Sequence, residues 1–144
     1  MLTMQARTRQ ELADALQRRN VPEEAASAVL DRMTEVGLIN DAEFADAWVD
    51  SRQQRRQMSK TGLRRELRRK GVDKELVEEA VGRVSGEDER AAARALAQKK
   101  LRSCRGLEAH VQRRRIAGAL ARRGFSGDVV GSILRELTFE VEGG

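Results

Sequence analysis

The sequence lacks most of the residues from which catalytic and metal sites are built. Its 144 residues include no tyrosine, one histidine, one cysteine and one proline. A lone Cys104 excludes an internal disulfide and a site of several thiolates. His110 has neither a second histidine nor a carboxylate pair at a recognisable spacing, which excludes a zinc site and a nucleophile-base relay. We therefore expect no catalytic residues, no metal and no cofactor, and a protein that is not an enzyme.

Glycines and hydrophobic residues are not arranged for nucleotide binding or for membrane insertion. The glycines do not form the G-x-x-x-x-G-K-[ST] motif of phosphate-binding loops, so any effect on ATP hydrolysis is expected to act on another protein. No apolar run approaches the roughly 18 residues of a membrane span. Residues 1–9 are neither a signal peptide nor a lipidation signal. We expect a soluble, cytoplasmic protein with no membrane partner.

The residues that are abundant favour helices. Hydrophobic residues make up 40% of the chain, charged residues 35% and aromatic residues only 3%. Apolar residues recur at helical spacing over long segments, with a single proline to interrupt them. The segments without this periodicity are the chain ends and short glycine or serine stretches, which argues against extended disorder. The composition therefore predicts an all-α protein.

The chain contains an internal repeat of three copies. The copies run over residues 9–30, 60–81 and 113–134. Their apolar positions coincide, as Leu16, Leu67 and Leu120 illustrate, and a basic residue precedes a turn in each copy. The turn residues are Asn20, Gly71 and Gly124. These residue types tolerate the left-handed backbone that ends a helix, so each copy predicts a tight helix-turn-helix.

Residue types that cap helices mark where the predicted helices begin. Thr8 and Glu11 have the spacing of a capping box before the first copy. Ser59 takes the place of Thr8 in the second copy. After the turns of the second and third copies, Asp73 and Ser126 are suitable N-cap residues. The two helices of each copy are therefore expected to follow one another directly.

A further helix is predicted before the second copy and another before the third. The first of these begins with a second capping box, formed by Asn40 and Glu43. Its inward residues are Phe44, Trp48 and Val49. The other spans residues 88–102, and its inward residues are Ala91, Ala95 or Leu96, and Leu101. Each unit then has three helices, which can enclose a core that two helices cannot.

The predicted organisation is an elongated tandem array of three-helix repeats. The expected boundaries are residues 1–38, 39–84 and 87–141. The first repeat is expected to be incomplete, because residues 1–5 provide only the last turn of a leading helix. The final helix is expected to extend through residues 137–141, and the last residues to fray.

Positive charge is concentrated in two blocks. Residues 52–70 carry a net charge of +8 and residues 94–123 a net charge of +9, whereas the segments before, between and after them are acidic. One interpretation is two solvated helix faces. Two blocks at corresponding repeat positions instead favour a surface for a polyanion such as nucleic acid.

The candidate binding residues are basic side chains of these two blocks. In the first block they are Arg52, Arg55, Arg56, Lys60, Arg64, Arg65, Arg68 and Arg69. In the second block they are Arg102, Arg105, Arg113, Arg114, Arg115, Arg122 and Arg123. Arginine forks suit phosphate and carboxylate groups, which they bind bidentately. Phe44 and Trp48 are expected in the core rather than as stacking platforms, so recognition should be largely independent of base sequence.

The sequence resembles the RecX family of bacterial recombinase regulators. The resemblance rests on G-L-I-N-D-A-E-F-A-D-A-W followed by S-R, then on L-R-R-E-L-R-R-K-G-V-D and a final R-R-G-F, and it covers nearly the whole chain. Asn40 stands where the family usually has aspartate, which leaves helix capping intact. Membership implies an elongated molecule of tandem three-helix repeats. It also implies binding to RecA filaments on DNA and suppression of RecA's ATP hydrolysis and strand exchange.

The resemblance implies RecA, its nucleoprotein filament and single-stranded DNA as partners, and we expect the protein to act as a monomer. Inhibition of the filament is the expected effect, and stabilisation is the alternative. A different function, a sequence-specific helix-turn-helix DNA-binding protein, is suggested by residues 63–81 and predicts a preferred duplex site. A third possibility is a scaffold whose charge only keeps it in solution.

Overall fold

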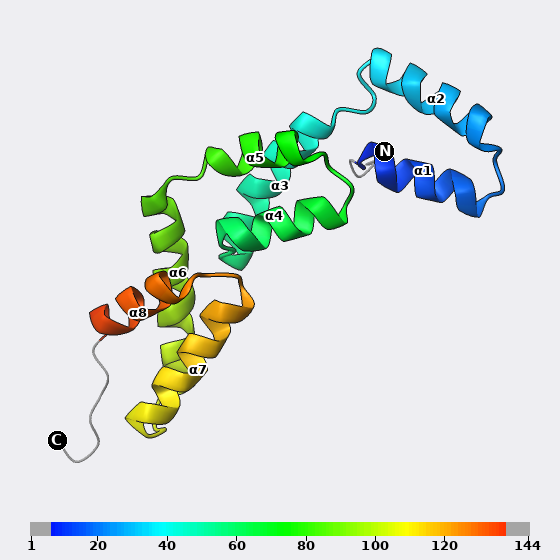
Figure 1. Cartoon of the computed structure of the whole chain (residues 1–144). Coiled ribbons are helices and arrows are strands. Elements are labelled where there is room, and N and C mark those ends of the chain that lie inside the picture. Colours follow the sequence, from blue (N-terminus) through cyan, green and yellow to red (C-terminus); the bar gives the residue numbers. More distant parts are fainter. Residues whose placement is uncertain (1–6, 138–144) are drawn as a thin grey trace, which may run out of the picture. The chain divides into compact units, whose positions relative to one another are not determined.

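The structure, a computed structural model, describes residues 7–137, apart from the side chains of Gln54 and Arg55. Within this part the chain forms eight α-helices and no strand, which confirms the predicted all-α class (Figure 1). The helices are α1 (Arg9–Arg18), α2 (Glu23–Glu35), α3 (Asp41–Arg56), α4 (Lys60–Arg69), α5 (Lys74–Gly82), α6 (Gly86–Ser103), α7 (Ala109–Arg122) and α8 (Gly127–Glu136). No helix among these residues is long and apolar enough to cross a membrane.

The described part divides into two compact units. One unit combines the chain up to Asp50 with Arg64–Arg83, and the other combines Ser51–Leu63 with the chain from Val84 onward. Helices α3 and α4 therefore contribute residues to both units. The boundaries of the three predicted repeats remain a prediction.

The turns of all three repeat copies adopt the predicted backbone. The φ angles of Asn20, Gly71 and Gly124 are 60°, 87° and 91°. Each residue follows the last turn of a helix, and the left-handed conformation stops the helix there. The prediction of three tight turns after α1, α4 and α7 is confirmed.

Most of the predicted helix caps are present. The Thr8 hydroxyl accepts a hydrogen bond from the Glu11 backbone N–H, and the Glu11 carboxylate accepts one from the Thr8 N–H, which completes the capping box. Asn40 accepts from the Glu43 N–H at 3.0 Å. Ser126 caps α8 by accepting from the Val129 N–H at 3.3 Å. These side chains satisfy N–H groups that a helix start would otherwise leave unpaired.

Helices α6, α7 and α8 enclose the core of the second unit. Its buried residues are Ala92, Ala93, Leu96, Ala97, Ile116, Leu120, Phe125 and Ile133. The prediction for α6 was partly wrong, because Ala91 and Ala95 are exposed while Leu96 is buried. Both exposed alanines lie two residues from the buried Ala93, about 200° around the helix, so they face solvent. Leu101 is half-buried against this core, in agreement with the prediction.

In the first unit, α1 and α2 bury fewer residues than α3, α4 and α5 do. Val49, Leu67, Val72, Val77 and Val81 are buried where α3, α4 and α5 meet. Helix α1 contains no fully buried residue. Helix α2 buries only two, Ala26 and Leu30. Helices α1 and α2 thus bury few apolar side chains.

Two predicted details are corrected. Phe44 and Trp48 are half-buried rather than fully inside, although Val49 beside them is only 3% exposed. Helix α8 ends at Glu136, because Leu137 has an extended backbone with ψ of 135°. The rest of the expected extension, residues 138–141, lies outside the described residues.

Candidate polyanion interface

Helix α4 carries the densest group of candidate residues. Leu63 and Leu67 are both 0% exposed, four residues apart on the inner side of the helix. Arg65, Arg68 and Arg69 are exposed on the remaining surface. The helical period of 3.6 residues explains this division, because residues at positions i and i+4 share one face. Burial of the two leucines therefore fixes the arginines outward.

The arginines of α4 differ in their partners. Arg64 is half-buried, and its Nε donates to both carboxylate oxygens of Glu78 at 2.9 and 3.2 Å. Arg68 donates to the carbonyl oxygen of Val72 at 3.2 Å. Neither Arg65 nor Arg69 forms a salt bridge with any of the described residues. These two guanidinium groups are the best placed on α4 to meet an external anion.

The remaining candidates of the first block are not part of this face. Arg52 is half-buried in α3 and interacts within the protein. Arg56 is exposed at the end of α3. Lys60 is half-buried at the start of α4, and its backbone N–H donates to a carboxylate oxygen of Glu89 at 2.6 Å. Arg55 belongs to α3, but its side chain lies outside the described residues.

The second block lies at the end of α6, just after it, within the first half of α7 and at the end of α7. Burial of Ile116 and Leu120 at 0% exposure fixes the inner side of α7. The exposed candidates are Arg102, Arg105, Arg113, Arg114, Arg115 and Arg122. Arg113 also interacts within the protein. In the repeat alignment, Ala117, Gly118 and Ala121 occupy the places of Arg64, Arg65 and Arg68, so α7 has no counterpart of the continuous arginine face on α4.

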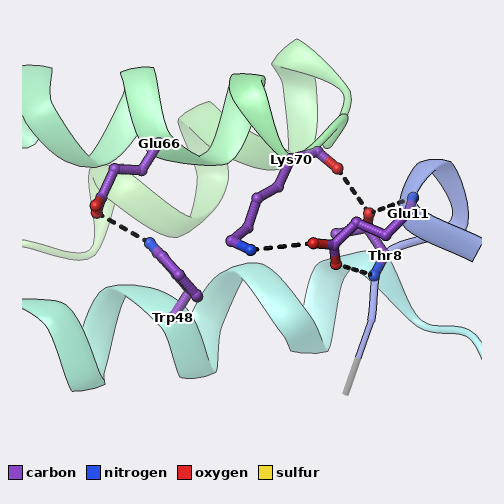
Figure 2. A network of polar contacts seen from close by, with 5 residues as sticks. All are labelled: Thr8, Glu11, Trp48, Glu66 and Lys70. Atoms are coloured by element: carbon purple, nitrogen blue, oxygen red, sulfur yellow. Dashed lines mark hydrogen bonds and ion pairs between the residues drawn. The ribbon is translucent and has the colours of Figure 1, made fainter. Parts of the chain in front are cut away.

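Thr8, at the start of α1, is joined to the end of α4 by a polar network that the sequence did not reveal (Figure 2). The Thr8 hydroxyl donates to the carbonyl oxygen of Lys70 at 2.6 Å. The Lys70 ammonium donates to the Glu11 carboxylate at 3.0 Å. The same ammonium lies 4.6 Å from the centre of the Trp48 ring, and Trp48 Nε1 donates to Glu66 at 3.1 Å. We call the contacts of Thr8 and Glu11 with Lys70, together with that of Gln10 with Gly71, the first joint.

The first joint changes the ionisation of Glu11. Partial burial raises the pKa of its carboxyl, whereas the hydrogen bond from the Thr8 N–H and the charge of Lys70 lower it. Together, the lowering effects outweigh the effect of burial, so the pKa of Glu11 lies below its ordinary value. Lys70, which was not among the candidate binding residues, thus has its charge engaged inside the protein.

The same arrangement recurs between Ser59 and the end of α7. The Ser59 hydroxyl donates to the carbonyl oxygen of Arg123 at 2.9 Å and accepts from the Gly62 N–H at 2.9 Å. The guanidinium of Arg123 donates to the carbonyl oxygen of Arg56 at 2.8 Å. We call the contacts of Ser59 and Gly62 with Arg123 and Gly124 the second joint. Arg123, a candidate binding residue, is therefore half-buried in a structural contact.

Cys104 and His110 take no part in the arginine face of α4 or in the two joints. The Cys104 thiol is buried and donates to the carbonyl oxygen of Lys100, with the sulfur 3.0 Å from that oxygen. His110 is exposed, and its Nδ1 lies 3.3 Å from the Glu108 carboxylate. Within the described residues, no group of three or more His, Cys, Asp or Glu side chains is close enough to hold a metal ion.

Comparison with known protein families accounts for the three repeats. The family models for the first, second and third three-helix domains of RecX match residues 1–33, 40–81 and 87–134. The chain belongs to the RecX family. The resemblance drawn from the sequence motifs is therefore confirmed.

Curated relatives named "Regulatory protein RecX" match almost the whole chain. The protein of Streptomyces lividans is 48% identical over 143 residues, which cover 99% of this chain and 76% of the relative. The protein of Thermobifida fusca is 46% identical over 143 residues, which cover 99% of this chain and 77% of that relative. This chain thus shares most of its length with regulatory members of the RecX family.

Solved structures share the fold. The crystal structure of RecX from Lactobacillus salivarius matches with a TM-score of 0.79 and 25% identity, over 92% of this chain and 86% of the other. A second crystal structure, of a regulatory protein RecX, matches with a TM-score of 0.81 and 23% identity, over 92% of this chain and 65% of the other. The chain therefore shares its fold with RecX proteins of known structure.

Proposed function

We propose that this RecX protein binds the RecA recombinase and the filament that RecA forms on single-stranded DNA, and that it inhibits ATP hydrolysis and strand exchange. It acts by occupying the filament and carries out no reaction of its own. Such a regulator belongs in the cytoplasm, in DNA repair by recombination and in the SOS response. Membership of the RecX family supports this proposal.

The outward arginine face of α4 is the observation that carries the proposal. Arg65, Arg68 and Arg69 are exposed together, and neither Arg65 nor Arg69 is neutralised by a described residue. Guanidinium groups bind phosphate and carboxylate oxygens bidentately, so this face suits both the DNA backbone and acidic protein surfaces. Exposed residues of α7 and the α6 end, including Arg114 and Arg115, provide a second basic area.

Binding through these residues should not depend on base sequence. Trp48 and Phe44 stack on each other with ring centres 5.8 Å apart, and Lys70 lies over the Trp48 ring. These rings are engaged within the protein, and the protein has no tyrosine. Contacts to phosphate without base stacking carry no sequence information. A sequence-specific helix-turn-helix protein, the alternative function, needs direct readout of base edges.

The test is a titration of RecA ATP hydrolysis on single-stranded DNA. The wild-type protein should inhibit at or below the molar amount of RecA. Reversing charge on α4 with Arg65→Glu and Arg69→Glu should weaken inhibition strongly. The matched control, Arg18→Glu with Arg19→Glu, changes the net charge equally on exposed residues at the end of α1 and should inhibit like the wild type.

Three results contradict the proposal. One is an absence of inhibition by the wild-type protein at equimolar RecA. Another is inhibition that the α4 charge reversal leaves unchanged. The third is a preferred duplex site with a footprint of operator size, which indicates the sequence-specific DNA-binding function instead. Circular dichroism of each variant establishes that its helices are intact.

A further inference from the structure

The first and second joints share one framework. In each, a buried hydroxyl, Thr8 or Ser59, caps a helix and donates to the carbonyl oxygen of the residue directly after another helix. In each, the next backbone N–H donates to a carboxylate: Arg9 N–H to Asp41 at 3.0 Å, and Lys60 N–H to Glu89 at 2.6 Å. Two joints built on the same contacts allow their differences to be compared directly.

The joints differ in what surrounds the shared contacts. The residue before the hydroxyl is the exposed Arg7 in the first joint and the buried Met58 in the second. Three residues after the hydroxyl, the first joint has Glu11 and the second has Gly62. The backbone at Gly62 packs so closely that a Cβ atom there would lie 2.6 Å from the Arg123 carbonyl oxygen. The second joint is therefore a close apolar and backbone contact.

The first joint depends instead on a pair of charges. The Lys70 ammonium and the Glu11 carboxylate are 3.0 Å apart, with 29% and 31% of their side chains exposed. Pairs with this much exposure are screened by salt. Lys70 also lies over the Trp48 ring at 4.6 Å and near the Phe44 ring at 6.0 Å. Release of the charge pair would therefore leave Lys70, which lies over both rings, without its contact to α1.

Apolar burial adds little to hold α1 in place. Helix α1 contains no fully buried residue. Its contact with the end of α4 is made by Thr8, by Glu11 and by Gln10, whose side chain lies against Gly71. Elements with few buried apolar contacts open with a lower free energy than the rest of a protein. Helix α1 has this character, whereas Ser59 and Gly62 lie beside the buried Met58.

We propose that the first joint is a hinge, which opens reversibly when the Glu11–Lys70 pair is screened or removed. Opening releases α1 and α2 from the end of α4 and uncovers Trp48 and Phe44. The second joint, in which the backbone at Gly62 packs closely against the Arg123 carbonyl oxygen, stays closed under the same conditions. The first two helices of this regulator thereby change position as one element, with all helices intact.

Trp48 reports on the hinge because it is the sole tryptophan of the protein. Its fluorescence is measured with acrylamide, a neutral quencher, from about 0.1 M to about 1 M KCl, over which the Debye length falls from about 10 Å to about 3 Å. Quenching of the wild-type protein should rise with salt, and its emission should shift to the red. Glu11→Gln should show raised quenching already at low salt, with little further change.

A control variant separates the hinge from a general effect of lost charge. Glu78→Gln breaks the Arg64–Glu78 pair, which at 2.9 Å is similar in length to the Glu11–Lys70 pair and is also partly exposed, but lies outside the first joint. Its quenching should match the wild type at every salt concentration. If Glu11→Gln matches the wild type as well, or if quenching rises only with loss of helical circular dichroism, the hinge is refuted.

Hydrogen exchange provides a second measurement on the same proteins. In Glu11→Gln, the amides of α1 and α2 should exchange faster, while those of α6, α7 and α8 keep their wild-type rates. Faster exchange in all of these helices would indicate general destabilisation and overturn the hinge, as would unchanged rates in α1 and α2.

Discussion

Thr8 and Lys70, which are 62 residues apart in the chain, are joined by a 2.6 Å hydrogen bond from the threonine hydroxyl to the lysine carbonyl oxygen. Ser59 and Arg123 repeat this contact at 2.9 Å. In both cases the hydroxyl also accepts a hydrogen bond from the N–H of its own helix start. One small side chain thus forms hydrogen bonds with an N–H group at the beginning of one helix and with a carbonyl oxygen at the end of another, and so links the two helices.

Removing either hydroxyl should destabilise the protein. In Thr8→Ala or Ser59→Ala, loss of the helix cap costs about 0.5–2 kcal/mol. The carbonyl oxygen at the end of the other helix also loses its donor, which adds about 1–3 kcal/mol if no water replaces it. Urea unfolding measures the change in the free energy of unfolding. Thr8→Ser keeps the hydroxyl and should remain close to the wild type; equal losses for Thr8→Ser and Thr8→Ala would contradict this role.

Gly124 should be far less tolerant of substitution than Gly37, although both have positive φ, at 91° and 81°. A Cβ atom at Gly124 would lie 2.5 Å from Ser59 Oγ and 2.8 Å from the Gly62 nitrogen, whereas nothing lies within 4 Å at Gly37. Gly37→Ala therefore incurs only the left-handed strain of about 1–2 kcal/mol. Gly124→Ala incurs in addition a cost of about 1–3 kcal/mol for overpacking. Thermal unfolding distinguishes them, and equal losses of stability would contradict a close approach at the second joint.

Local features of this fold were predictable from the sequence. The left-handed turns at Asn20, Gly71 and Gly124 depend on residue type and position alone. Asn20 can carry a side chain at its turn because it is exposed. At Gly71 a Cβ atom would lie 2.2 Å from Gln10, so glycine is required there for space as well as for conformation. The sequence predicted the turn at Gly71, but it did not predict that Gln10 lies against this glycine.

Contacts between distant segments were not predictable. Nothing in the sequence indicates that the Thr8 hydroxyl meets a carbonyl oxygen 62 residues later. Trp48 and Phe44 were expected inside because of their helical spacing, yet Lys70 covers them only partly and they remain half-buried. Ser59 occupies the place of Thr8 in the repeat, which indicated a shared helix cap but not the carbonyl oxygen that each hydroxyl meets.

Glu11 should make stability depend on pH in a defined direction. Its pKa in the folded protein lies below the ordinary 4.5, so the ionised carboxylate stabilises the fold at every pH above 4.5. This contribution is lost as the pH falls through the lowered folded-state value. The difference in unfolding free energy between wild type and Glu11→Gln should be largest near neutral pH and shrink below pH 4.5. Urea unfolding at several pH values measures it.

The control for this pH dependence is Glu79→Gln. Glu79 is exposed on α5 and forms no salt bridge with the described residues. The free energy of unfolding of Glu79→Gln should depend on pH in the same way as that of the wild type. A stability difference for Glu11→Gln that is the same at acid and neutral pH would show that the carboxylate charge contributes nothing.

The arginine face of α4 should determine how binding to single-stranded DNA responds to salt. Each phosphate contact on a single strand contributes about −0.7 to the slope of log affinity against log salt concentration. If Arg65 and Arg69 each contact one phosphate, replacing both with glutamine should reduce the steepness by about 1.4. Fluorescence anisotropy with a labelled oligonucleotide, over a salt series, measures the slope. Arg18→Gln with Arg19→Gln removes the same charge from exposed positions on the acidic first part of the chain. An equal reduction in both double variants would mean that net charge, and not the α4 face, governs binding.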